Sequence, residues 1–159
     1  MIIFTTLICV LPYLWFILIG KNNSKKNEKL FKDVIKRENV SFNTKEQWNN
    51  NFIGIDESKN ILIFVKLINQ EAYSLKIDLN ELKSCRINKK TRDYKKEKKI
   101  ETELQSLDLE LTLKNEIITL HFYNSNDQFS EYMEIKRAEK WLHFIEQSKL
   151  KSISHDKVA

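Results

Sequence analysis

Residues 104–113 read LQSLDLELTL, and this stretch decides the fold class. Its last four leucines recur at every second position, with polar residues between them. Because successive side chains of a β-strand point to opposite faces, this spacing predicts a strand with one buried face. The segment KNE at 114–116 suits a tight turn with Asn115 in a left-handed position, and IITLHFYNS at 117–125 is predicted to return as the hairpin partner.

Strand-like segments also precede this hairpin. NFIGID at 51–56 and ILIFVKLI at 61–68 flank a predicted turn, and YSLKIDL at 73–79 alternates without a break. The segment at 83–94, KSCRINKKTRDY, begins with a strand-like pattern and continues with mostly charged residues. We therefore expect six or so antiparallel strands, with four residues of the alternating segments pointing into one core: Leu75, Ile77, Leu109 and Leu111.

The period changes after the last predicted strand. In residues 126–150 apolar side chains recur with the spacing of one helical face: Ala138, Trp141, Leu142 and Ile145. Asp127 or Ser130 suits the N-cap of this amphipathic helix. A half-buried antiparallel sheet followed by one such helix predicts an α+β domain, in which the C-terminal helix closes a curved sheet.

The chain opens with MIIFTTLICVLPYLWFILIG, and Ile2 to Ile19 include no charged side chain. A helix of this length spans roughly 27 Å, close to the thickness of the bilayer core. A cleaved export signal would need a basic start and a small-residue cleavage site, and a core helix would be shorter or amphipathic. We therefore predict an uncleaved transmembrane helix.

Charge predicts the orientation of this span. No basic side chain precedes it, and seven follow it closely: Lys21, Lys25, Lys26, Lys29, Lys32, Lys36 and Arg37. Basic residues beside a span remain in the cytosol. We expect a cell-membrane protein with its N-terminus outside and its C-terminal domain in the cytoplasm.

A second helix is predicted just after the span, where an apolar stripe runs through a basic segment: Leu30, Phe31, Val34 and Ile35. Four apolar residues make a small surface for lipid, so packing on the domain is favoured over lying on the membrane. The predicted divisions are a transmembrane helix at 1–20, a basic juxtamembrane helix and connector at 21–50, a β-domain with its C-terminal helix at 51–150, and a tail at 151–159.

Three segments together resemble a known fold: WNNNFIGIDESKNILIFVKL at 48–67, IDLNELKSCRI at 77–87, and AEKWLHFIEQ at 138–147. With the leucine-alternating hairpin between them, residues 52–150 resemble the pleckstrin-homology-like superfold, including its GRAM-type relatives. The whole chain is similar to small bacterial membrane-anchored proteins of unknown function. The resemblance implies a binding domain and transfers no catalytic residue.

The residue types needed for catalysis or metal binding are sparse. The three histidines, His121, His143 and His155, fall on different predicted elements, and Gly20 and Gly54 are the only glycines. We therefore expect no metal site, no cofactor, no phosphate-binding loop and no enzymatic activity. Cys9 in the span and Cys85 in a strand do not suggest a disulfide framework.

Basic residues are concentrated in two places. Residues 86–99 have a local excess of six positive charges and residues 21–50 an excess of four, so the remainder of the chain is negative at −5. The first stretch contains the candidate residues for contact with an anionic surface: Lys89, Lys90, Arg92, Lys95, Lys96, Lys98 and Lys99. Each basic residue near an anionic leaflet contributes about 1 kcal/mol. Nucleic acid is not expected, because Tyr94 is the only aromatic residue there.

Two interpretations of the basic stretch remain beside lipid contact: a solvated hairpin loop, which charge patterning favours, and a surface for an acidic protein. For the whole chain we expect a single-pass membrane protein with a non-catalytic binding or scaffold domain. The alternative is a small structural accessory subunit of a larger membrane complex. The expected partners are the lipid bilayer through residues 2–19 and either anionic lipid headgroups or membrane proteins.

Overall fold

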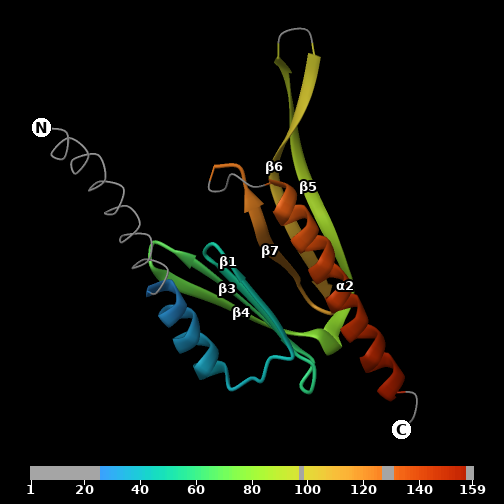
Figure 1. Cartoon of the computed structure of the whole chain (residues 1–159). Helices are drawn as coiled ribbons and strands as arrows, with labels where there is room; N and C mark the ends of the chain where they lie inside the picture. Colours follow the sequence, from blue (N-terminus) through green and yellow to red (C-terminus); the bar gives the residue numbers. More distant parts are fainter. Residues whose placement is uncertain (1–25, 97–98, 127–130, 157–159) are drawn as a thin grey trace, which may run out of the picture.

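The computed structural model describes residues 26–96, 99–126 and 131–156. It contains a helix over residues 26–38, seven strands, one 3₁₀ turn and a C-terminal helix (Figure 1). In chain order these are β1 (Thr44–Trp48), β2 (Asn51–Asp56), β3 (Ile61–Ile68), β4 (Glu71–Asp78), η1 (Leu79–Glu81), β5 (Leu82–Lys96), β6 (Lys99–Leu113), β7 (Ile117–Asn124) and α2 (Glu131–Asp156). The predicted α+β class, with antiparallel strands and a closing helix, is confirmed.

The predicted span over residues 2–19 lies outside the described residues. Within the described ranges, no helix has both the length and the apolar character needed to cross a bilayer.

The strands form two antiparallel sheets, one with the order β1-β2-β3-β4 and one with the order β5-β6-β7. The main core lies between them, and α2 buries Ala138, Trp141 and Ile145 in it. Figure 1 shows α2 lying across the second sheet, and helix 26–38 lying against the first. Both faces of the first sheet are therefore buried, one against the second sheet and one against helix 26–38.

Helix 26–38 packs as the sequence favoured. Phe31 is 1% exposed and its ring lies 6.1 Å from that of Phe52 on β2. The other apolar residues of the stripe pack in the same cluster: Leu30, Val34 and Ile35. The residues before Asn51 thus share their core with the strands that follow.

Gly54 on β2 allows the segment after helix 26–38 to approach the sheet. A Cβ atom at this position would lie 2.5 Å from the ring of Phe42, which itself packs edge-on against Phe52. A contact below 3.0 Å requires the neighbour to move. Any larger residue at position 54 would therefore displace Phe42.

The alternating pattern of β6 is confirmed, because its inward leucines are buried: Leu107, Leu109, Leu111 and Leu113. Ile77 on β4 is buried, as predicted, but Leu75 is 40% exposed, so the prediction that it packs in the core is wrong. Leu75 lies opposite Phe64 and is on the core-facing side of the strand. However, β4 is an edge strand that no ladder joins to β5, so its first half is not covered.

Two elements differ from the predicted ones for a shared reason. β1 was not predicted, because Trp48 is the only large apolar residue of TKEQW. α2 continues to Asp156 through residues predicted to be a tail. In both segments the alternation of apolar and polar residues is weak. Packing against neighbouring elements therefore decides their conformation.

Asparagine supplies most of the left-handed turn positions in a chain with two glycines. Among the described residues, positive φ angles occur at Asn39, Asn49, Asn60, Asn69 and Gln70. The predicted hairpin of β6 and β7 is confirmed, but the predicted left-handed conformation of Asn115 is wrong. The turn closes instead through a hydrogen bond of 2.8 Å, in which the Leu113 amide donates to the carbonyl oxygen of Glu116.

The register of β6 predicts different costs for neighbouring substitutions. Leu109 is fully buried, so Leu109→Ala should lower the free energy of unfolding by about 2–5 kcal/mol. Glu110 faces away and pairs with Arg86, whose side chain is 72% exposed, so Glu110→Ala should cost less than about 1 kcal/mol. Urea unfolding of the full chain in detergent, monitored by tryptophan fluorescence, measures the free energy of unfolding of both variants. Equal losses at the two positions would contradict this register.

Candidate functional site: a basic hairpin arm

β5 and β6 extend well past the rest of their sheet. The last pair between β6 and β7 is Ser106 with Asn124, while β6 continues pairing with β5 as far as Lys96 and Lys99. We call this extension, residues 91–96 and 99–105, the arm. At about 3.3 Å per residue it projects roughly 20 Å beyond β7. Figure 1 shows its outer part standing clear of the other elements, whereas Leu104 near its base is buried in the main core.

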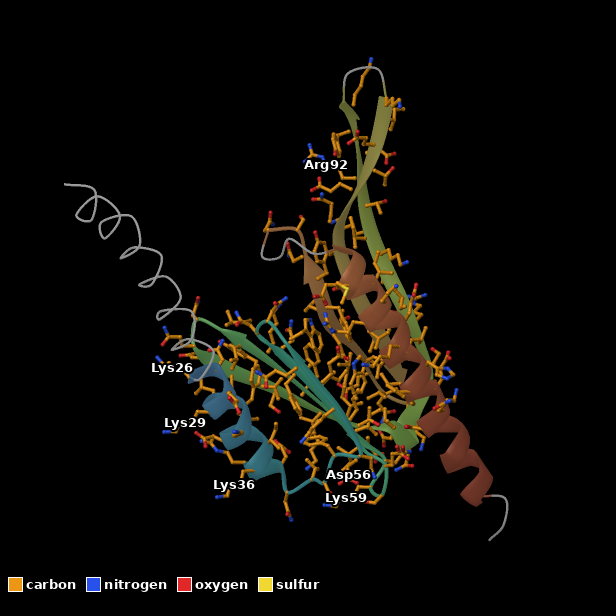
Figure 2. All side chains as sticks on the ribbon, viewed as in Figure 1. Lys26, Lys29, Lys36, Asp56, Lys59 and Arg92 are labelled. Atoms are coloured by element: carbon orange, nitrogen blue, oxygen red, sulfur yellow. The ribbon has the colours of Figure 1, made fainter. Side chains whose placement is uncertain are left out.

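The candidate contact residues lie on or beside this arm. Lys89 and Lys90 lie at its base, and Arg92, Lys95 and Lys99 lie along it, all exposed to solvent (Figure 2 labels Arg92). Lys96 ends β5, and Lys98 lies outside the described residues. The basic segment is therefore largely two paired strands, where the sequence predicted a charged loop.

Pairing cancels much of the positive charge that the sequence places in this segment. Arg92 lies opposite Glu103, and Tyr94 lies opposite Glu101. The phenol of Tyr94 donates a hydrogen bond of 2.9 Å to Glu101, and this bond raises the pKa of Tyr94. Residues 91–105 together hold five basic and four acidic side chains. The arm as a whole is therefore nearly neutral.

The base of the arm is neutralised in a similar way. Arg86 pairs with Glu110 at 2.6 Å, and Lys89 lies 4.0 Å from Glu139 on α2. The basic side chain of each pair, Arg86 or Lys89, is exposed to solvent, so the two pairs add little to the free energy of unfolding. They reduce the positive field where the arm leaves the domain.

Positive charge remains at the far end of the arm. Residues 95–100 hold four lysines and one glutamate. Lys95 pairs across the strands with Ile100, and Lys96 pairs with Lys99. Ile100 is 77% exposed, more than any other large apolar side chain that the structure describes. The sequence analysis missed Ile100, for which the only signal was a single isoleucine between charged residues.

The described part of helix 26–38 begins beside two turns of the first sheet. Lys26 donates a hydrogen bond to Gln70 in the β3–β4 turn, and Asn27 donates one of 3.0 Å to Asn50 in the β1–β2 turn. Figure 2 shows Lys26 and Lys36 at opposite ends of the helix, with Arg92 of the arm well apart from both. Residue 26, from which the chain leads back to residues 1–25, therefore lies beside these two turns.

A polar cleft of about 300 Å³ connects these turns with the end of β7. It is lined by residues 49–51, 66–69 and 122–124, of which five are asparagines. Ser125, just past β7, donates a hydrogen bond of 2.9 Å to the carbonyl oxygen of Gln105 at the base of the arm. The two turns, the cleft and residue 26 thus lie on the side of the domain from which the base of the arm leaves, and we call this side the arm end.

Acidic side chains elsewhere have structural partners. Asp56 is buried, and its carboxylate accepts hydrogen bonds from the Ser58 hydroxyl at 2.5 Å and from the Ser41 amide at 2.9 Å. These bonds outweigh the effect of burial and lower the pKa of Asp56. Asp56 therefore serves turn formation, because it joins the β2–β3 turn to the segment after helix 26–38 (Figure 2 labels Asp56).

No group of three His, Cys, Asp or Glu side chains suited to a metal ion occurs among the described residues. His121 on β7 lies 2.8 Å from Asp108, and His143 on α2 lies 2.9 Å from Gln147. Burial raises the pKa of the Cys85 thiol to about 12, so this thiol is protonated at neutral pH and a poor nucleophile.

A polar cluster joins β1 to α2 at the edge of the main core. Glu46 accepts hydrogen bonds from Arg137 at 2.8 Å, Lys140 at 2.8 Å and Trp141 at 2.9 Å. Burial opposes the charge of Glu46, but these three donors lower its pKa to about 2. Arg137 also pairs with Glu134 at 2.6 Å, where burial raises the pKa of Glu134.

Comparisons of the chain with protein-family models, with curated proteins and with solved structures found no match.

The lowered pKa of Glu46 predicts an acid-dependent contribution to stability. Its folded pKa lies below its ordinary 4.5, so this contribution is complete above pH 4.5 and is lost as the pH falls towards about 2. Glu46→Gln should cost about 1.5–3 kcal/mol at pH 7, because it removes the charge from three hydrogen bonds. The difference between parent and variant should shrink between pH 4.5 and 2 in urea unfolding. Glu139→Gln, at an exposed position of α2, is the matched control, and an equal loss there would contradict the assignment.

Proposed function

We propose that this chain is a single-pass membrane-anchored protein whose pleckstrin-homology-like domain is a non-catalytic binding or scaffold module in the cytoplasm. Support for the fold comes from two antiparallel sheets that enclose one core, with a C-terminal amphipathic helix packed on it. This is the arrangement that the sequence resemblance to GRAM-type domains implies. Support for the anchor comes from the uncharged run between Ile2 and Ile19.

One observation favours this proposal above the others: residue 26 lies on the side of the domain from which the arm leaves. Lys26 donates a hydrogen bond to Gln70 in the β3–β4 turn. The cleft beside that turn reaches the end of β7, where Ser125 is hydrogen-bonded to Gln105 at the base of the arm. If residues 2–19 span a bilayer, the arm end faces the membrane.

A tether through residue 26 would hold the domain near the membrane. The seven peptide steps from Ile19 to Lys26 reach at most roughly 25 Å when extended. Such a tether raises the effective concentration of the arm at the membrane, so weak contacts are sufficient to orient the domain.

A binding role agrees with the chemistry of the described residues. Glu46 and Asp56 both have pKa values lowered by structural hydrogen bonds, and Cys85 has a raised one. Each of these groups holds elements of the fold together or packs in its core. A catalytic acid or base would instead be expected in a cleft with a pKa near the working pH.

The edge strand β4 supports the alternative, a structural accessory subunit of a membrane complex. Tyr73 is 54% exposed and Leu75 is 40% exposed on a strand with one unpaired edge. Exposed apolar residues on a free edge suit contact with another protein. Purification of the intact chain in mild detergent separates the two interpretations, because a stoichiometric set of membrane proteins would favour the subunit.

An integral protein should resist alkaline extraction. When membranes that contain the full chain are washed with alkaline carbonate, the protein should stay in the pellet, since the span cannot leave the bilayer without exposing its apolar surface. Immunoblotting of pellet and supernatant measures this. Release into the supernatant, or a mature N-terminus after Gly20, would refute the anchor.

The basic residues after the span predict a cytosolic C-terminus. A reporter that is active only in the cytosol should therefore function when it is fused after Ala159. The matched fusion carries a reporter that is active only outside the cell and should be silent. The opposite pair of results would reverse the orientation and favour an export signal.

A further inference from the structure

The cross-strand pairs of the arm divide it into two parts of different charge. Moving inward from its end, the first two pairs are Lys96 with Lys99 and Lys95 with Ile100. Their four side chains include three lysines and no acid. This outer part is basic and has one exposed apolar side chain.

Each of the next three pairs contains a carboxylate. These pairs are Tyr94 with Glu101, Asp93 with Thr102, and Arg92 with Glu103. Two of them are closed by hydrogen bonds, from Tyr94 to Glu101 at 2.9 Å and from Thr102 to Asp93 at 2.7 Å. An anionic surface would attract the outer part and repel this inner part, so favourable contact is restricted to the outer pairs.

The exposed isoleucine gives the outer part a second property. Ile100 is 77% exposed, the most exposed large apolar side chain that the structure describes, and its cross-strand partner is Lys95. Lysine stems are apolar, and their ammonium groups can reach lipid phosphates while a neighbouring apolar group enters the interface. A strand end of this composition suits the boundary between headgroups and acyl chains better than it suits water.

We propose that the outer part of the arm docks on an anionic lipid surface, with Ile100 inserted at the headgroup level and the surrounding lysines beside the lipid phosphates. This inference rests on the proposed membrane anchor, and it narrows the contact from the whole basic segment to the two outer pairs: Lys95, Lys96, Lys99 and Ile100. The domain then meets the membrane at two places, the tether before residue 26 and the end of the arm.

The experiment uses the full chain in nanodiscs, with a polarity-sensitive fluorophore on Ile100→Cys in a Cys9→Ser background. Cys85 can remain, because burial raises the pKa of its thiol to about 12 and so suppresses labelling. Phosphatidylcholine discs are compared with discs that also contain phosphatidylglycerol. In the anionic discs the label should shift to shorter emission wavelength and resist quenching by soluble iodide, and high salt should reverse both effects.

Ile117→Cys is the matched control position. Ile117 is 63% exposed and begins β7 at the opposite end of the molecule from the arm. A label there should behave alike in both kinds of disc. If the residue-100 label is quenched in anionic discs as strongly as the residue-117 label, the inference is wrong.

Two charge variants separate contact at the arm from attraction by total charge. Replacement of Lys95, Lys96, Lys98 and Lys99 by Gln should abolish the response of the residue-100 label. Replacement of four basic residues on helix 26–38 by Gln removes the same charge and should leave most of the response: Lys29, Lys32, Lys36 and Arg37. Equal losses in the two variants would overturn docking through the arm.

The anchor is scored separately by carbonate extraction of membranes that contain the full chain. Loss of the protein from the pellet refutes the proposed function, and the residue-100 label measured with anionic and neutral vesicles still decides the arm contact. Retention in the pellet with an unprotected label refutes the arm contact alone. A label that ignores both kinds of vesicle and responds to heparin would assign the arm to a polyanion other than lipid.

Discussion

The packing of Trp48 is the contact on which the other elements depend. Its indole ends β1 and lies 5.1 Å from the ring of Phe122 on β7 and 6.4 Å from that of Phe64 on β3. The guanidinium of Arg137 on α2 lies 4.7 Å from the same ring. One side chain therefore joins both sheets and the C-terminal helix, although no hydrogen-bond ladder connects the two sheets. Aromatic contacts of this kind add specific geometry to the area they bury.

The polar cluster around Glu46 orients α2 on this core. Apolar packing alone permits a helix to slide along a sheet, whereas hydrogen bonds from Arg137, Lys140 and Trp141 to one carboxylate fix its position. The cluster lies at the edge of the core, where the Glu46 side chain is 22% exposed. Partial exposure lowers the cost of bringing these charges together, and the three donors keep Glu46 ionised.

α2 packs on the second sheet and helix 26–38 on the first, so both helices contribute apolar residues to the two cores. The asparagine-rich turns, the polar cleft and residue 26 lie together on the side of the domain from which the arm leaves. The arm adds lysines and the exposed Ile100 to the groups on this side.

Local sequence patterns determined most of the elements, because the side-chain periods of strands and helices are properties of neighbouring residues. NFIGID and ILIFVKLI became β2 and β3 with the predicted bounds, and the leucines of β6 face inward. Only the tertiary structure decided the exposure of Leu75, the strand at β1 and the charge of the arm. The exposure of Leu75 depends on whether the second sheet covers it, and residues of that sheet are distant in sequence. The strand β1 is joined to α2 by the hydrogen bond from Arg137 to Glu46. The arm is nearly neutral because β6 brings Glu101 and Glu103 beside the basic residues of β5, and cross-strand register cannot be read from one strand.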